Sequence, residues 1–187
     1  MLIHLNLSRL SDERLMADGS ERAFAELYNR YARRLQGFLV RQLGGDRELA
    51  ADFCHDAFLR IYDARRTYNA GRPFRTWLFS VAYNLCKNRY RHLQVEAEAM
   101  AQIDRQPEAE LPTVEADLSQ AEFDAALPRV PDGLPAEARM LFALRFDGEL
   151  SIAETAAVIG LPEGTVKSRQ HKIMNHIKQQ LAAALLP

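Results

Sequence analysis

Apolar residues recur at three- and four-residue steps over most of this chain, the spacing that places side chains on one face of an α-helix. Three such stripes occupy its first half. They consist of Phe24, Leu27, Tyr28, Tyr31, Leu35, Phe38 and Leu39, then of Leu49, Phe53, Ala57, Phe58, Ile61 and Tyr62, and then of Phe74, Trp77, Leu78, Val81, Ala82 and Leu85. Turn-forming residues at 44–46 and 68–73 separate the stripes, and the third helix is expected to end near Arg91. Because no segment alternates as a strand does, the pattern predicts an all-α fold.

The segment 94–130 departs from this pattern. Residues 94–126 hold nine acidic side chains and one basic one, a net charge of −8, and prolines occur at 107, 112 and 128. This composition favours a solvated tether, with at most a partial helix around 118–127. The sequence therefore predicts two small helical domains, residues 1–93 and 131–187, joined by a flexible acidic linker at 94–130.

Residues 151–169 have the form of a helix, a tight turn and a second helix. Ser151 and Glu154 have the spacing of a capping box, in which each side chain bonds the other residue's backbone N–H. Gly160 supplies the turn, where a left-handed backbone costs least. Pro162 suits the first turn of the next helix, because its missing N–H would be unpaired there. The pattern is that of a helix-turn-helix, whose second helix can enter the major groove of DNA.

The second helix of this motif has an apolar side and a basic side. The apolar side consists of Val166, Gln170, Ile173, Ile177 and Leu181, and the opposite side of Ser168, His171, Lys172 and Asn175, flanked by Lys167 and Arg169. No acidic residue occurs between Gly164 and Leu185, so the helix can approach phosphates. A helical hairpin with a solvated cationic face is the alternative. The coincidence of capping box, glycine turn and acid-free helix favours DNA binding.

A second region combines basic and aromatic residues. Between Arg60 and Arg91 the chain holds eight basic residues against the single Asp63, interleaved with Tyr68, Phe74, Trp77, Tyr83 and Tyr90. Cations can follow phosphates while rings stack on unpaired bases. Asn84, Asn88 and Arg91 fall on one helical face, and their side chains can read base edges. The alternative is that the aromatic residues belong to the core, which we favour for Trp77, Leu78 and Val81.

Composition narrows the classes of protein that remain. The formal charge is −1, but the chain outside 94–126 carries +7, and this clustering of sign is the relevant electrostatic feature. Cys54 and Cys86 make neither a disulfide framework nor a zinc site, and packing is favoured over a redox role.

Without a signal peptide or a run of about 20 apolar residues, a cytoplasmic protein with no membrane insertion of its own is expected. No phosphate-binding loop, metal-spaced set or nucleophile motif is present, so we expect neither an enzyme nor a cofactor.

Two segments together resemble a known family. Residues 51–58 (ADFCHDAF) and 74–84 (FRTWLFSVAYN) are similar to region 2 of bacterial sigma factors, and residues 150–172 are similar to region 4. The short length resembles the extracytoplasmic-function (ECF, group IV) class of the sigma-70 family. This resemblance implies a sigma factor that binds core RNA polymerase and promoter DNA, with region 4 reading the −35 element as duplex and region 2 capturing the melted −10 element as single strand.

The resemblance also implies roles for individual residues. The −35 positions are Thr165, Lys167, Ser168, Arg169, His171 and Lys172; the −10 positions are Tyr68, Asn69, Arg72, Asn84, Asn88 and Arg91; and the polymerase-binding positions are Asp52, His55 and Asp56. At the last site this chain has His55-Asp56 where the family usually has Gln-Glu. Ile173-Met174 likewise departs from the small residue and arginine that often follow the −35 helix.

Two further expectations concern partners and alternatives. The resemblance implies an anti-sigma factor, which could clamp two modules joined by a flexible link. The alternative reading is a helix-turn-helix regulator with an N-terminal sensory or dimerisation module, which would dimerise on a palindromic site. A sigma factor would instead copurify with polymerase.

Overall fold

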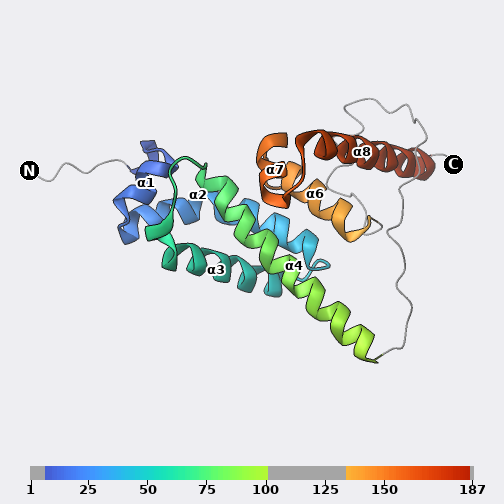
Figure 1. Ribbon diagram of the computed structural model, residues 1–187, viewed down its shortest axis with the longest axis horizontal. Helices are drawn as coiled ribbons and strands as arrows, with labels where there is room; N and C mark the ends of the chain where they lie inside the picture. Colours follow the sequence, from blue (N-terminus) through green and yellow to red (C-terminus); the bar gives the residue numbers. More distant parts are fainter. Residues whose placement is uncertain (1–6, 101–133, 186–187) are drawn as a thin grey trace, which may run out of the picture.

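The computed structural model describes the backbone of residues 7–100 and 134–185, all of it helices and their connections (Figure 1). The N-terminal module, up to Met100, holds two short 3₁₀ helices and four α-helices: η1 (Leu7–Arg9), α1 (Asp12–Asp18), α2 (Glu21–Gln42), α3 (Arg47–Asp63), η2 (Arg65–Thr67) and α4 (Phe74–Met100). The C-terminal module, from Leu134, holds α6 (Ala136–Phe146), α7 (Ile152–Ile159) and α8 (Glu163–Leu185). The expected all-α fold is confirmed, and the three apolar stripes form α2, α3 and α4.

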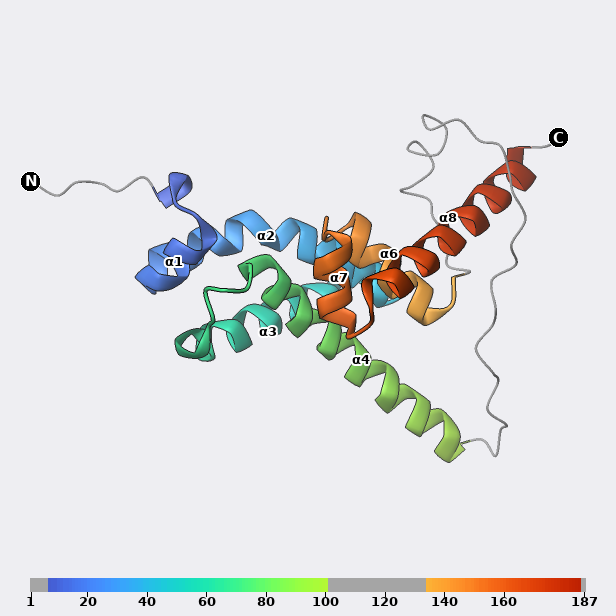
Figure 2. The same ribbon diagram turned by 45° about the horizontal axis from the view of Figure 1, so that its top comes forward.

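Two features of the N-terminal module differ from the sequence expectation. The helix α1 has only seven residues and begins after its N-cap Ser11. No apolar stripe in the sequence indicated this helix. The helix α4 continues to Met100 instead of ending near Arg91, and its second half extends away from the other helices (Figures 1 and 2). The partial helix considered at 118–127 lies outside the described residues.

Aromatic and branched side chains from α2, α3 and α4 build the core of the N-terminal module. The largest buried ones include Phe38, Phe74, Phe79, Leu35 and Ile61, all fully enclosed. The rings of Phe38 and Phe79 meet edge to face at 5.7 Å, a favourable geometry for their quadrupoles. This core fixes the direction in which the outer face of α4 points.

The guanidinium of Arg30 attaches the start of the chain to α2. It donates hydrogen bonds to the backbone carbonyls of Leu7, Ser8 and Leu10 and to the carboxylate of Asp12, at 2.9–3.1 Å. The Tyr31 hydroxyl donates to the same carboxylate. Five donors in a rigid plane suit Arg30 to satisfy several carbonyls at once. The network holds η1 and the start of α1 against α2.

The helix-turn-helix forms as its sequence predicts. Ser151 accepts a hydrogen bond from the Glu154 N–H, and the Glu154 carboxylate accepts one from the Ser151 N–H at 2.8 Å. Gly160 has a φ of +81°, and its N–H donates to the carbonyl of Ala156 at 2.8 Å. Ala156, Val166, Ile173 and Ile177 are buried against Leu141 and Phe142 of α6. The C-terminal module therefore has a core of its own.

The two modules also pack against each other, which the sequence did not indicate. Met140, Ala143, Leu144, Leu150 and Val158 of the C-terminal module are buried in the core cluster of the N-terminal module. The helix α6 packs on α2 and α7 packs on α4 (Figure 2). The modules thus share apolar surface in addition to the covalent connection.

Gly160 and Gly37 offer a matched pair of alanine substitutions. Gly160→Ala places a Cβ on a left-handed residue and is expected to lower the free energy of unfolding by about 1–2 kcal/mol. Gly37 is exposed within α2, and a Cβ there meets nothing within 4 Å. Gly37→Ala is expected to raise the free energy of unfolding by about 0.5–1 kcal/mol, because alanine loses less backbone entropy in a helix. Urea unfolding followed by circular dichroism measures both. If both substitutions changed the free energy of unfolding in the same direction, this explanation of the two glycines would be wrong.

Candidate nucleic-acid interface

The loop of residues 68–73 is held in one shape by its own side chains. The Tyr68 ring stacks on Trp77 with centroids 5.2 Å apart, and its hydroxyl donates to the Arg72 carbonyl at 2.8 Å. The Asn69 side-chain oxygen accepts the Gly71 N–H at 2.8 Å. These contacts leave the side chains of Asn69 and Arg72 exposed. The loop presents an amide and a cation beside a half-buried ring.

Tyr68 is neutral at physiological pH. Burial raises its pKa to about 12, and the nearby carboxylates of Glu13 and Asp12 act in the same direction. A neutral phenol can stack on an unpaired base without repelling a nearby phosphate.

A hollow of about 480 Å³ adjoins this loop, and sequence reasoning missed it. Its lining combines α1, the turn after it, η2 and the loop, with the residues Glu13, Met16, Ala17, Gly19, Arg65, Arg66, Tyr68 and Ala70. The volume lies within the usual range of small-ligand pockets, about 300–1,000 Å³. Because the lining comes from residues 13–19 and 65–70, which lie far apart in the chain, no local pattern of the sequence could reveal the hollow.

The outer face of α4 carries the other three residues expected at the −10 element. Asn84, Asn88 and Arg91 are all exposed, while Ala82, Leu85 and Cys86 on the opposite side are buried. The sequence interpretation of Leu78, Trp77 and Val81 as core residues is confirmed, since Leu78 is fully buried and the other two pack against the core. The helix thus separates an apolar interior side from a polar outer side.

The helix α8 shows the same division. Lys167, Ser168, His171 and Lys172 are exposed and Thr165 is half-buried, whereas Val166, Ile173 and Ile177 are buried. Arg169 forms an ion pair with Glu137 of α6 at 2.9 Å. Both partners of that pair are substantially exposed, so it contributes little to stability and leaves Arg169 able to exchange partners.

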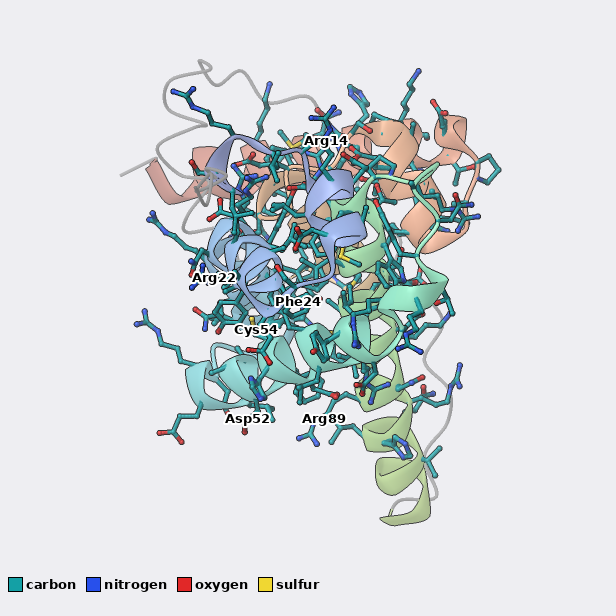
Figure 3. The ribbon with its side chains drawn as sticks, turned by 90° about the vertical axis from the view of Figure 1, so that its left-hand side faces the viewer. Arg14, Arg22, Phe24, Asp52, Cys54 and Arg89 are labelled. Carbon is teal, nitrogen blue, oxygen red and sulfur yellow. The ribbon has the colours of Figure 1, made fainter. Side chains whose placement is uncertain are left out.

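A third set lies on α3. Asp52 and His55 are exposed, and Figure 3 shows Asp52 on the outer side of this helix. Asp56 pairs with Arg60 one turn later, at 3.1 Å. The three expected polymerase-binding residues therefore share one outer surface of α3. The structure places the expected −35 residues on α8, the expected −10 residues on the loop of residues 68–73 and on α4, and the expected polymerase-binding residues on α3.

The two cysteines are free and lie in the interior. Burial raises the pKa of the Cys54 thiol to about 11 and that of Cys86 to about 12. A thiol, unlike a thiolate, is a poor nucleophile, so these groups are unreactive where they stand. Across residues 7–100 and 134–185 no group of three metal-ligating side chains is found.

Two family models of known proteins match this chain. Residues 27–95 match the family of Sigma-70 region 2, and residues 132–179 match Sigma-70 region 4. The ECF RNA polymerase sigma factor RpoE of Cereibacter sphaeroides is 30% identical over 171 residues, covering 87% of this chain and 88% of that protein. SigW of Bacillus subtilis, another ECF sigma factor, is 28% identical over 171 residues, covering 87% and 91%.

The chain belongs to the ECF sigma factor family. Sigma factors of this family direct promoter-specific initiation of transcription. Two solved structures share the fold: CnrH in complex with the cytosolic domain of CnrY (TM-score 0.65, 23% identity, 92% of this chain and 97% of that one), and the sigma factor RpoE in complex with the anti-sigma factor NepR from Bartonella quintana (0.63, 21%, 88% and 99%). No helix among the described residues of this sigma factor is long and apolar enough to cross a membrane.

The buried thiols give a test of their structural role. Because burial raises both pKa values, we expect the folded sigma factor to react with a thiol reagent at pH 8 more slowly than the unfolded chain, roughly 100-fold at Cys54 and roughly 1,000-fold at Cys86. Release of thionitrobenzoate from Ellman's reagent, with and without denaturant, measures the two rates. Equal rates in the two states would contradict the packing interpretation.

Proposed function

We propose that this sigma factor reads its promoter with two separate surfaces. The exposed face of α8 binds the −35 element as duplex in the major groove, through Thr165, Lys167, Ser168, Arg169, His171 and Lys172. The loop of residues 68–73 and the outer face of α4 hold the melted −10 element, through Tyr68, Asn69, Arg72, Asn84, Asn88 and Arg91. Asp52, His55 and Asp56 of α3 contact core RNA polymerase.

The observation that carries the proposal is the division of α4 and α8 into a buried apolar side and an exposed polar, basic side. The α8 face lies at the N-terminal part of a recognition helix, the part that enters a major groove in helix-turn-helix proteins. The α4 face adjoins a loop with a neutral ring and a hollow beside it, which suits an unpaired base withdrawn from the stack. Duplex and single strand thus have surfaces of different chemistry.

The deciding experiment is transcription in vitro with core polymerase, with and without this sigma factor, on a library of promoter fragments. We expect specific start sites only when the sigma factor is present, and mapping them gives the promoter. If the sigma factor fails to support specific initiation, the proposed function is wrong. Copurification with polymerase, in place of dimerisation on a palindrome, separates it from an ordinary helix-turn-helix regulator.

We also propose an anti-sigma factor as partner. The relative from Bartonella quintana forms a complex with such a protein, and a groove of about 500 Å³ between α4 and the C-terminal module offers apolar side chains beside Lys87 and Arg91. We expect copurification of a protein that blocks transcription when added back. Recovery of polymerase subunits alone from uninduced cells would contradict this partner.

Lys167→Ala and Lys172→Ala test the −35 surface. Each removes a phosphate-binding cation, so each is expected to weaken binding of holoenzyme to the mapped promoter and to reduce the slope of log affinity against log salt by about one unit. Lys178, further along α8, provides a matched Lys178→Ala control with an unchanged slope. If the slope of log affinity against log salt is unchanged in either variant, the substituted lysine does not contact a phosphate.

Asn84→Ala tests the −10 surface. The loss of an amide that reads a base edge, worth about 1–3 kcal/mol, is expected to reduce open-complex formation roughly tenfold or more while binding of core polymerase is retained. Permanganate reactivity of unpaired thymines and a polymerase-binding assay give the two readouts. Asn29→Ala, at an exposed asparagine of α2, is the control. Loss of polymerase binding in the Asn84 variant would instead mark Asn84 as structural.

A further inference from the structure

Gln170 lies among apolar residues on the inner side of α8. Its neighbours along that side are Val166, Ile173 and Ile177, which are buried in the core of the C-terminal module. The side-chain oxygen of Gln170 accepts a hydrogen bond from the Nε–H of Arg145, in the last turn of α6, with 2.9 Å between the two heavy atoms. Both side chains are half-buried. A polar group in an apolar stripe is costly unless it is paired, so this bond explains why a glutamine is tolerated there.

The guanidinium of Arg145 also holds the other helix of the helix-turn-helix. One of its terminal N–H groups donates to the backbone carbonyl of Leu150. Leu150 immediately precedes Ser151, the N-cap of α7. One side chain of α6 therefore bonds both the start of α7 and the second turn of α8. Because the guanidinium is planar and rigid, it fixes the directions of the two bonds relative to each other.

The rotation of α8 about its own axis decides where its exposed side chains point. Apolar contacts on the inner side hold the helix against the core, but apolar burial is non-directional. Side chains extend about 5–6 Å from a helix axis, so a rotation of about 20° moves their ends by about 2 Å. A binding site needs its side chains held within about 0.5 Å and about 10–20°. Gln170 lies between Arg169 and His171, two of the proposed −35 residues, so a bond that fixes Gln170 also orients them.

We propose that Arg145 and Gln170 are positioning residues for recognition of the −35 element. The bond between them sets the rotation of α8, so that Lys167, Ser168 and their exposed neighbours meet the base pairs in one orientation. Both residues act through the helix and not through a contact of their own with DNA. This inference rests on the proposed function for its consequence, whereas the hydrogen bond itself can be observed without DNA.

Gln170→Leu is the main test, because it removes the acceptor without a change of charge and suits the apolar stripe. The readout is the ratio of holoenzyme affinities for the mapped promoter and for the same promoter with one base pair of its −35 element exchanged. The parent is expected to prefer the matched promoter roughly tenfold or more. We expect Gln170→Leu to lower this ratio severalfold and to leave the affinity for the exchanged promoter nearly unchanged. Gln170→Glu keeps an acceptor for Arg145 and is expected to keep the ratio.

Arg145→Met separates positioning from a direct phosphate contact. Positioning leaves the slope of log affinity against log salt unchanged, whereas loss of a phosphate contact would reduce the slope by about one unit. Because Gln170 acts only through Arg145, the double variant R145M/Q170L is expected to have the same ratio as Arg145→Met alone. A further loss in the double variant would show that the two residues act independently.

Leu134→Ala is the matched control for stability. Leu134 is buried in the same core and takes no part in the Arg145–Gln170 bond. The control is therefore expected to lower the free energy of unfolding, measured in urea, and to keep the ratio of affinities. A ratio that falls as far in Leu134→Ala as in Gln170→Leu would mean that lost stability explains both, and the positioning role would be wrong.

Nuclear magnetic resonance of the isotope-labelled full chain observes the bond without DNA. We expect a slowly exchanging Nε–H signal from Arg145 that is lost in Gln170→Leu. If the parent prefers the matched promoter and Gln170→Leu prefers it equally, or if the salt slope falls in Arg145→Met, this inference is overturned and the proposed function stands. If the parent shows no preference for the matched promoter, the proposed reading of the −35 element is wrong and this inference fails with it.

Discussion

The carboxylate of Glu154 is the interaction on which both the local and the global structure depend. It closes the capping box that starts α7, and it also accepts hydrogen bonds from Arg75 and Thr76 at the start of α4. Burial alone would raise its pKa, but the hydrogen bonds from Ser151 and Arg75 outweigh burial and the pKa is lowered. The group is therefore ionised at neutral pH. One charge thus begins the helix-turn-helix and joins it to α4 of the N-terminal module.

The use of Arg75 in this contact explains how the basic N-terminal module can dock on a module whose helix α8 has no acidic residue after Glu163. The helix α8 therefore supplies no carboxylate to pair with the arginines of the N-terminal module. The acids that pair with the N-terminal module stand instead in the turn before α7 and in its first helical turn, on the opposite side of the motif. The C-terminal module therefore presents an acidic edge to the N-terminal module while keeping its cationic face exposed.

Local signals in the sequence predicted most of the fold, and long-range contacts account for what they missed. Each of these local signals depends on residues only a few positions apart in the chain. They are the capping box at Ser151, the turn at Gly160 and the three apolar stripes, and each formed as expected. The exposure of Asn84 and Lys167 followed from the same periodicity. The docking of the modules depends on partners 79 and 106 residues apart, such as Arg75 with Glu154 and Arg41 with Asp147, and no local pattern records such pairs. The extra length of α4 was missed because Glu96–Met100 is acidic, although its residues are good helix formers.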